Sequence, residues 1–384
     1  MQRLALHDFH FSLRARFTEL NGVEMVSDYS DWLAEHAALQ QSAGVLDLSF
    51  RSRICLTGAD RVRFLHGQVT NDVKRLRVGE GCYSAITTNK GKMESDLNIF
   101  CLADELLLDF EPGLTEKVSR RLEKFIVADD VQVEDVVPHY GLLSVQGPKA
   151  EDVVKSVGLF AEVPARPFDS AKASDATLGE IYLMQHGRLG TSGLDLFVPN
   201  NSLWAVANKL IAAAKQTGGR ACGWQAFETA RIEAGIPRFG MDMDETNLPL
   251  ECGIENRAIS YKKGCYIGQE VINRIHSFGH VNKELRGLRL VDPANAGLPL
   301  PQRGDKLFRG GKEVGYITSA VSSPEFGNVA LGYVRRETNQ IGTELMLRTA
   351  MGESSARVVD TPFMGERHGS SGMNENGDTP SLSV

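Results

Sequence analysis

The sequence predicts an α+β fold with largely antiparallel sheets and a small β-barrel at its C-terminal end. Three observations carry this prediction. Helical and strand patterns between residues 44 and 282 come in mixed runs rather than in strict β–α–β alternation. Residues 141–235 contain a β–α–β–β–α run that resembles half of a split βαβ unit. From residue 283 onward, glycine and proline separate short strand patterns at close spacing, as in a small barrel or sandwich.

Composition sets the broad class of the protein. A chain of 384 residues with 42% hydrophobic and 24% charged residues predicts two or three globular domains. The net charge of −7 disfavours strong, sequence-independent nucleic-acid binding, which needs a basic surface. No apolar run approaches the roughly 20 residues of a membrane span, and residues 1–16 lack the apolar core of a signal peptide. We therefore expect a cytoplasmic monomer without direct membrane contact.

Motif spacing argues against several kinds of site. The six cysteines are too sparse for a disulfide scaffold, and none form a CxxC pair. The nine histidines contain no HExxH motif, so we expect no metal centre. The glycines form neither GxxxxGK[ST] nor GxGxxG between a strand and a helix, which disfavours NTPase and dinucleotide-binding proteins.

The first part of the chain predicts a helical lead-in and then a mixed domain. Residues 1–43 look mainly helical, because Trp32, Leu33, His36 and Leu39 fall on one helical stripe. After them, the pattern predicts strands at 51–57, 83–88, 93–102, 105–110 and 131–136, with helices at 58–69 and 114–126. The turn signal at 89–92 joins two of these strands in a hairpin.

The second part of the chain contains the remaining predicted elements. Strands at 142–145, 180–185 and 193–198 alternate with helices at 148–157 and 202–216, and a further helix covers 224–234. A loop-like acidic stretch follows, and a short helix is expected at 271–277. The barrel covers 283–364, and residues 365–384 have the composition of a disordered tail.

The stretch from Lys262 to Glu270 combines two cations, a thiol, an amide and a carboxylate. Cys265 comes shortly before the predicted helix and follows Lys262 and Lys263, and both features favour a thiolate. One interpretation is a reactive or ligand-binding cysteine in a cleft. The other is a tight turn between Gly264 and Gly268 that carries a small buried cysteine.

Three further charged residues are candidates, each with a structural alternative. Asp96 and Glu94 share one strand face, either as a solvated edge or as acid–base groups in a cleft. Arg231 either pairs on a helix surface with Glu228 or points into a cavity, where it would suit a carboxylate or the polar edge of a ring. Asp195, inside an apolar strand, either faces solvent or accepts two hydrogen bonds from an amidine-like edge such as that of a pterin.

A set of short segments, in order along nearly the whole chain, resembles the tetrahydrofolate-binding superfamily of the glycine-cleavage T-protein, an aminomethyltransferase. The segments include 44–49, 64–68, 70–73, 91–97, 145–148, 193–199, 231–235, 315–319 and 330–334. Lys263-Gly264-Cys265-Tyr266, followed by Gly268-Gln269-Glu270, is similar to the signature of the YgfZ branch of that superfamily.

The resemblance implies a three-domain T-protein-like ring around a central folate cleft. The first, folate-binding domain would be discontinuous, comprising 44–140 and 236–282, and 141–235 would form the second domain. The resemblance assigns a catalytic role to Asp96 and Cys265, and folate contacts to Asp195, Arg231 and Arg188. Arg188 stands where the T-protein has a tyrosine in a Tyr-Thr-Gly-Glu run. This departure argues against aminomethyl transfer but is compatible with folate binding.

The YgfZ resemblance leads to three hypotheses. The first is a tetrahydrofolate-binding accessory protein for assembly or repair of iron–sulfur enzymes, including tRNA-modifying radical enzymes, with Cys265 as the functional thiol and iron–sulfur client or assembly proteins as partners. The second is a folate-dependent aminomethyltransferase of the glycine-cleavage type, which uses tetrahydrofolate or a one-carbon derivative. The third is a non-catalytic folate-binding scaffold.

Overall fold

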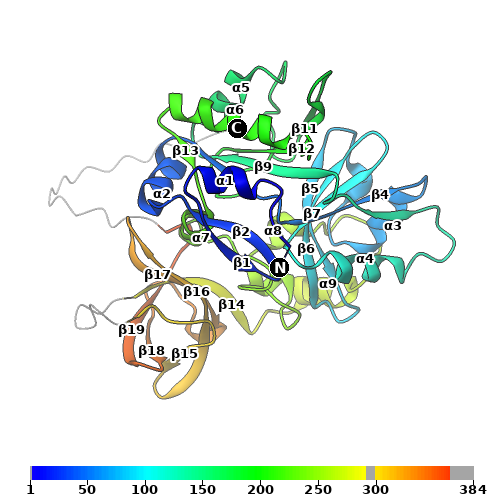
Figure 1. Ribbon diagram of the computed structural model, residues 1–384. Coiled ribbons are helices and arrows are strands. Elements are labelled where there is room, and N and C mark those ends of the chain that lie inside the picture. The colour runs from blue at the N-terminus through cyan, green and yellow to red at the C-terminus, as the bar shows by residue number, and fades with distance from the viewer. Residues whose placement is uncertain (1, 291–298, 364–384) are drawn as a thin grey trace, which may run out of the picture.

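The computed structural model of the chain describes residues 2–290 and 299–363 (Figure 1). Within these ranges the chain forms a five-stranded sheet, a six-stranded sheet, a closed barrel and a two-stranded hairpin. The barrel lies at the lower left of Figure 1, the five-stranded sheet at the right, and the six-stranded sheet toward the top. The predicted α+β class with a C-terminal barrel is confirmed. In the described ranges, no helix is long and apolar enough to cross a membrane. The predicted tail at 365–384 lies outside them.

The five-stranded sheet is antiparallel and has helices on one face. Its strands, in spatial order, are β5 (Gly81–Thr87), β6 (Met93–Cys101), β7 (Leu106–Phe110), β4 (Ser52–Thr57) and β8 (Gln132–Asp135). Helices α3 (Arg61–Gln68) and α4 (Thr115–Glu123), with the short η1 (Val73–Arg75), cover it. Leu65 and Leu122 from these helices share a buried core with Ile54, Leu97 and Leu108 of the strands. This burial follows the apolar periodicity of both kinds of element.

The segment that follows the second sheet returns to pack on the first one. It carries η2 (Pro249–Cys252), α8 (Glu255–Ala258) and α9 (Gln269–Phe278). Ile254 and Ile272 from this segment share a buried core with Ala85 and Met93 of the β5–β6 hairpin. The five-stranded sheet is therefore completed by residues from two distant parts of the sequence.

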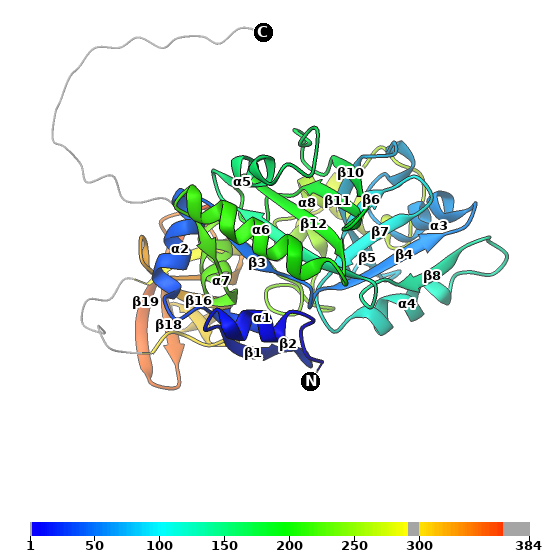
Figure 2. The same ribbon diagram turned by 45° about the horizontal axis from the view of Figure 1, so that its top comes forward.

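The six-stranded sheet has the order β10-β11-β12-β9-β3-β13. Its strands are β10 (Ser170–Asp175), β11 (Gly179–Gln185), β12 (Gly193–Pro199), β9 (Tyr140–Gln146), β3 (Gly44–Asp47) and β13 (Arg220–Ala221). Helices α5 (Ala150–Val157) and α6 (Leu203–Gln216) pack against it, and Figure 2 shows α6 lying along this layer. The sequence pattern at 170–175 does not predict β10, because none of its residues is buried and alanine is its only apolar residue type.

One predicted domain boundary is wrong for the strand at residue 44. We assigned residues from 44 onward to the first domain, but β3 pairs antiparallel with β9 and parallel with β13, inside the six-stranded sheet. All four residues of β3 are buried. Such a short apolar strand has no sequence feature that specifies its partner, because pairing is set by tertiary packing.

The barrel closes in the order β14-β17-β16-β15-β18-β19. Its strands are β14 (Lys283–Leu290), β15 (Lys306–Arg309), β16 (Lys312–Ser323), β17 (Gly327–Arg335), β18 (Glu344–Thr349) and β19 (Gly352–Val359), and η4 (Arg336–Thr338) follows β17. The sequence patterns at 285–291, 306–308, 313–319, 329–334 and 344–347 predict five of these strands, whereas no pattern predicts β19. β19 pairs with both β14 and β18, so it is the strand that closes the barrel and leaves no free edge.

The N-terminal region is only partly helical, which corrects the prediction for residues 1–43. Helices α1 (His7–Ser12) and α2 (Trp32–Gln41) flank a hairpin of β1 (Arg16–Leu20) and β2 (Val23–Asp28). Asn21 and Gly22 form its turn with positive φ angles of 52° and 84°. An Asn-Gly pair between two strands is a strong hairpin signal, because both residues tolerate the left-handed conformation that a type I′ turn requires.

Arg231 connects three parts of the fold. It lies on α7 (Trp224–Glu233) with 2% of its surface exposed. Its guanidinium pairs with Asp242 and Glu228, donates to the Ser319 hydroxyl of β16 at 2.8 Å, and donates to the Ile236 carbonyl at 3.2 Å. Because Ser319 also donates to Asp242 at 2.7 Å, the barrel is tied to the loop after α7 through one buried charge pair.

We expect Arg231→Ala to destabilise the protein strongly, because it leaves the fully buried Asp242 carboxylate without its counter-ion. Breaking a buried pair from one side costs about 3–5 kcal/mol. Urea unfolding followed by circular dichroism would measure the loss. Arg120→Ala, which removes an exposed pair with Glu116 on α4, is the matched control and should leave the midpoint nearly unchanged. Equal midpoints for the two variants would contradict the connecting role of Arg231.

Candidate functional site

A cleft of about 400 Å³ lies where the two sheets and α7 meet. Strands β5 and β6 contribute Tyr83 and Asp96 to its wall, and the loop after β11 contributes His186 and Arg188. The wall also contains the C-terminal end of α7 and the segment after it, as well as Arg257 of α8. The lining is rich in arginine and carboxylate groups, so the cleft is suited to a polar ligand with an apolar body.

Asp96 is the acid of this cleft with an unoccupied oxygen. Its Oδ2 atom accepts a hydrogen bond of 2.8 Å from the Tyr83 hydroxyl, while Oδ1 is buried and has no partner among the described residues. Burial and the nearby charge of Glu111 raise the pKa of Asp96 to about 6, against the opposing effect of the Tyr83 hydrogen bond. A buried carboxylate with one free oxygen and a pKa near neutrality can accept or hold a proton from a bound amine.

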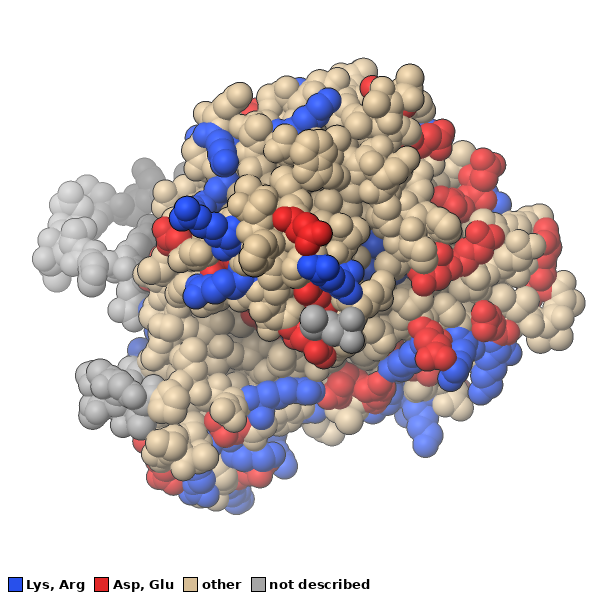
Figure 3. Space-filling view, in the orientation of Figure 1, with Lys and Arg blue, Asp and Glu red and all other residues tan. Residues whose placement is uncertain are grey.

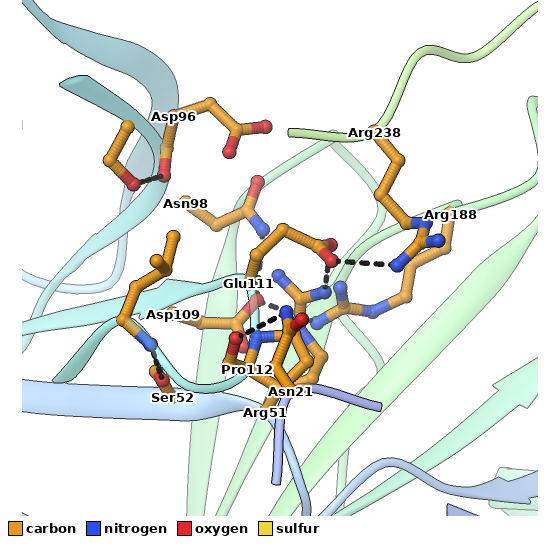
Figure 4. A network of polar contacts seen from close by, with 12 residues as sticks. Asn21, Arg51, Ser52, Asp96, Asn98, Asp109, Glu111, Pro112, Arg188 and Arg238 are labelled. Carbon is orange, nitrogen blue, oxygen red and sulfur yellow. Dashed lines mark hydrogen bonds and ion pairs between the residues drawn. The ribbon is translucent and has the colours of Figure 1, made fainter. Parts of the chain in front are cut away.

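Below Asp96, a buried network of alternating charges joins the two sheets (Figure 4). Arg51 donates to Asp109 at 2.8 Å and to Glu111 at 2.9 Å. Glu111 also accepts from Arg238 at 3.2 Å, and Asp109 accepts from Arg188 at 2.8 Å. Burial disfavours the charged form of Asp109, but the charges of Arg188 and Arg51 outweigh that effect and hold its pKa well below the usual range.

Arg188 and Asp195 form an ion pair in this network. Arg188 donates through Nε to both oxygens of Asp195, at 2.9 and 3.2 Å, and His186 Nδ1 lies 2.9 Å from Asp195 Oδ2. Burial lowers the pKa of His186, and Arg188 lowers it further, so the imidazole is neutral at pH 7. Asp195 has no exposed surface. Its carboxylate orients Arg188 and His186, and these two residues, rather than Asp195, line the cleft.

Arg231 also reaches the cleft wall, but its guanidinium is committed to the contacts described above. Only its Nε atom is buried without a partner in the described structure. The predicted folate contacts therefore divide into two kinds. Arg188 presents a side chain to the cleft, whereas Arg231 and Asp195 chiefly hold the surrounding structure.

No residue of the stretch around Cys265 is among those that line the cleft. Cys265 is exposed, whereas the other five cysteines are buried or half-buried. The Lys263 amine points inward and donates to the carbonyls of His66, Val69 and Asn71 at 2.6, 2.6 and 2.8 Å. Burial lowers the pKa of Lys263 to about 8, while Asp72 opposes this shift. Lys263 therefore anchors the loop to α3, and the expectation that Cys265 faces the folate channel is not supported by the cleft lining.

The remaining residues of the stretch shape the turn into α9. Gly268 has a φ of 90°, and a Cβ there would lie 2.5 Å from the carbonyl of Thr88, so only glycine fits. Tyr266 is buried, with the Lys263 amine 4.9 Å from its ring centre. Gln269 donates to the Gly264 carbonyl at 3.4 Å, and Glu270 lies in the first turn of α9, where its charge suits the helix N-terminus.

Several residues of the cleft were not among the predicted candidates. They are Tyr83, Arg51, Glu111, Arg238, Arg257 and His186, and Asp109 of the network beneath the cleft was missed with them. The signal for two of them was present, because Asp109 and Glu111 alternate around Phe110 at the end of a strand in which every residue is buried. An acid inside such a strand requires a cationic partner. The arginines come from segments that are remote in sequence, and no local sequence pattern indicates that they reach the cleft. Among the described residues, no group of three or more His, Cys, Asp or Glu side chains could hold a metal ion.

Comparison with models of known protein families assigns the chain to a family. The GCVT N-terminal domain model matches residues 6–263, about two thirds of the chain. The chain belongs to the glycine cleavage T-protein family. The model of the glycine cleavage T-protein C-terminal barrel domain matches residues 283–364, which contain the barrel. The superfamily resemblance found in the sequence is thereby confirmed, whereas the comparisons do not distinguish the YgfZ branch.

Individual relatives match this chain along nearly its whole length. The aminomethyltransferase of Bacillus subtilis (strain 168) is 28% identical over 366 residues, which is 94% of this chain and 99% of that protein. The aminomethyltransferase of Symbiobacterium thermophilum is 29% identical over 377 residues, covering 96% and 98%. The crystal structure of the glycine cleavage system aminomethyltransferase T from Bartonella henselae superposes with a TM-score of 0.83 at 24% identity, covering 95% of this chain and 99% of that one. This last match shows that the three-part fold is shared.

The pKa of Asp96 predicts a measurable pH dependence of stability. The folded pKa of about 6 lies above the ordinary value of 3.8, so the folded state holds this proton more tightly than the unfolded state. The resulting stabilisation is fully present below about pH 4 and is lost as the pH rises through 6, a change on the order of 3 kcal/mol. Asp96→Asn removes it. The stability of Asp96→Asn relative to wild type should therefore increase between pH 4.5 and pH 7.5 in urea titrations. Asp104→Asn, at an exposed turn, should show no such trend, and a pH-independent difference for Asp96→Asn would contradict the assignment.

Proposed function

We propose that the cleft binds tetrahydrofolate, or a one-carbon derivative of it, and that the protein transfers an aminomethyl-type one-carbon group onto it. The observation that carries this proposal is the free Oδ1 atom of Asp96 at the wall of a cleft of ligand size. The proposal is supported by family membership. It is also supported by relatives that are named aminomethyltransferases and that match this chain along nearly their whole length.

The residues of the cleft have separate parts in this proposal. Asp96 accepts a hydrogen bond from, or takes a proton from, the amine of the transferred group or a ring nitrogen of the folate. Tyr83 holds the Asp96 carboxylate in place through its hydroxyl. Arg188 and the neutral His186 present polar groups to the ligand, while Asp195 fixes their orientation. Arg257, over the ring of Tyr83 with its guanidinium 5.1 Å from the ring centre, offers a cation for a ligand carboxylate at the mouth.

Asp96→Asn should retain folate binding but lose transfer. The purified protein would be incubated with tetrahydrofolate and an aminomethylated lipoyl carrier, and methylene-tetrahydrofolate would be quantified. We expect a rate loss of about 100-fold or more in Asp96→Asn, because general acid–base groups contribute that much. Asp104→Asn should have the wild-type rate.

The same samples test folate binding separately by thermal shift. A ligand at about 100 times its dissociation constant stabilises the folded state by roughly 2.7 kcal/mol, so the shift in melting temperature is measurable. Tetrahydrofolate should raise the melting temperature of wild type and Asp96→Asn alike. Binding without product in the wild type would leave the non-catalytic scaffold, whereas no shift at all would remove the folate proposal.

A second candidate function is based on the YgfZ-like signature in the sequence. In it the protein is a folate-binding accessory factor for iron–sulfur enzymes, and the exposed Cys265 thiol meets the client protein directly. The observation in its favour is that Cys265 is the exposed cysteine of the six. No name among the relatives reported above refers to iron–sulfur proteins, so this candidate rests on the sequence signature and the exposure of the thiol.

Cys265 distinguishes the two candidates. Iodoacetamide should alkylate Cys265 well before the buried Cys101, as mapped by mass spectrometry, because exposure governs access to the thiol. In a strain that lacks the gene, Cys265→Ala should fail to restore the activity of an iron–sulfur enzyme under oxidative stress, whereas Cys101→Ala should restore it. Full rescue by Cys265→Ala would remove the accessory role of the thiol and leave the transferase proposal intact.

A further inference from the structure

A second cavity, of about 870 Å³, lies at the seam between the first domain and the barrel. It shares no lining residue with the folate-type cleft. Its wall comes from four separate segments: the β5–β6 hairpin, the loop before α8, the connection from α9 to β14, and the end of β17 with η4 and the residues after it. The backbone of Arg336 donates to the carbonyl of Asn282 at 3.0 Å, so the last two segments are fixed to each other.

The wall of this seam cavity is predominantly basic. Lys92, Lys283, Arg335 and Arg336 line it, against the carboxylates of Glu251 and Glu337. Glu251 is buried and accepts from the backbone of Leu248 at 2.9 Å, so part of its acceptor capacity is used internally. The chain as a whole has a net charge of −7, so this cluster is a local region of positive potential on an acidic protein.

Three of the four cations have no carboxylate partner within ion-pair distance in the described parts of the chain. Lys92 donates to the Thr246 carbonyl at 2.7 Å, and Lys283 donates to the Tyr316 hydroxyl at 3.0 Å. Arg336 makes no described ion pair, whereas Arg335 lies 4.0 Å from Glu337. The guanidinium fork of Arg336 is therefore available for bidentate contact with an oxyanion.

Lys283 is held in position without being neutralised. Its amine lies 4.5 Å from the ring centre of Tyr333 and 5.1 Å from that of Tyr316, and Tyr333 is almost fully buried beneath it. Aromatic faces stabilise the cation and displace part of its water, but they carry no formal charge. A pre-positioned, partly dehydrated ammonium group binds an anion more strongly than a freely hydrated lysine does.

We propose that the seam cavity binds a small multivalent oxyanion, a phosphate- or carboxylate-bearing metabolite, between Lys283 and Arg336. The Lys92 amine faces the same space from the hairpin side. Because the cavity is bounded by both the first domain and the barrel, a bound anion crosslinks them and stabilises their packing. The site is independent of the folate-type cleft and of any transfer reaction there.

Isothermal titration of the full-length protein with citrate and with inorganic phosphate, each at ionic strength matched with sodium chloride, tests the proposal. We expect saturable binding of at least one of the two anions and a rise in melting temperature. Arg336→Gln and Lys283→Met should each weaken that binding by about tenfold or more, since each removes a charge-assisted contact. Lys312→Gln, at the exposed start of β16, is the matched control and should bind as wild type does.

The two anions separate the possible ligand sources. Binding of citrate alone assigns the site to polycarboxylates, and binding of phosphate alone assigns it to phosphorylated compounds. Arg336 is exposed, so Arg336→Gln should fold normally even if Lys283→Met does not. Unchanged affinity in Arg336→Gln, or no saturable binding of either anion at millimolar concentration, would overturn the proposal. The tetrahydrofolate thermal shift should be the same in Arg336→Gln and wild type, so failure here is distinguishable from failure of the proposed function.

Discussion

The buried charges between the two sheets are the constraint on which the rest of the structure depends. Asp109 of the five-stranded sheet has no exposed surface and accepts from Arg51 of the same sheet and from Arg188, in the loop between β11 and β12, so the Arg188–Asp109 pair links the two sheets. Each ion would be strongly unfavourable alone, and together they are stable in only one relative position of the sheets. The cleft exists because this position leaves Asp96 and Arg188 on facing walls (Figure 4).

The same network gives the cleft its chemical character. Glu111 lies between two arginines, yet it is close enough to Asp96 to help raise the pKa of that acid. Asp195 and Asp109 both form ion pairs with the Arg188 guanidinium, and these pairs fix its position at the wall of the cleft.

The charges on the protein surface are arranged differently from those of this buried network. Figure 3 shows basic and acidic side chains interspersed on one face, where exposed pairs contribute little energy and solvent screens them.

The sequence predicted the fold better than it predicted the contacts within the site. Apolar periodicity located most of the helices and strands that have a buried apolar face, because burial of Leu65, Leu108 and Leu122 requires that spacing. It missed β10, in which no residue is buried, and it placed residues 44–47 with the first domain, because a four-residue strand with two apolar side chains does not specify its partner. For the site, the predicted Asp96 and Arg188 line the cleft, whereas the sequence could not show that Asp195 and Arg231 are bound up in buried ion pairs. Their partners, His186 and Asp242, are determined by tertiary structure, and the lysine predicted to activate Cys265 instead binds three carbonyls of a distant segment.

The return of the chain to its first sheet has a consequence for synthesis on the ribosome. All five strands of that sheet have emerged by Asp135, but Ala85 and Met93 stay uncovered until Ile254 and Ile272 arrive. Five of the six strands of the other sheet, all except β3, are translated in between. Throughout that interval the nascent protein exposes an apolar sheet face that has no native partner, a condition that favours aggregation and chaperone binding. Because a segment distant in sequence completes the core of the five-stranded sheet, the incompletely translated chain is the form of this protein that is most prone to aggregation.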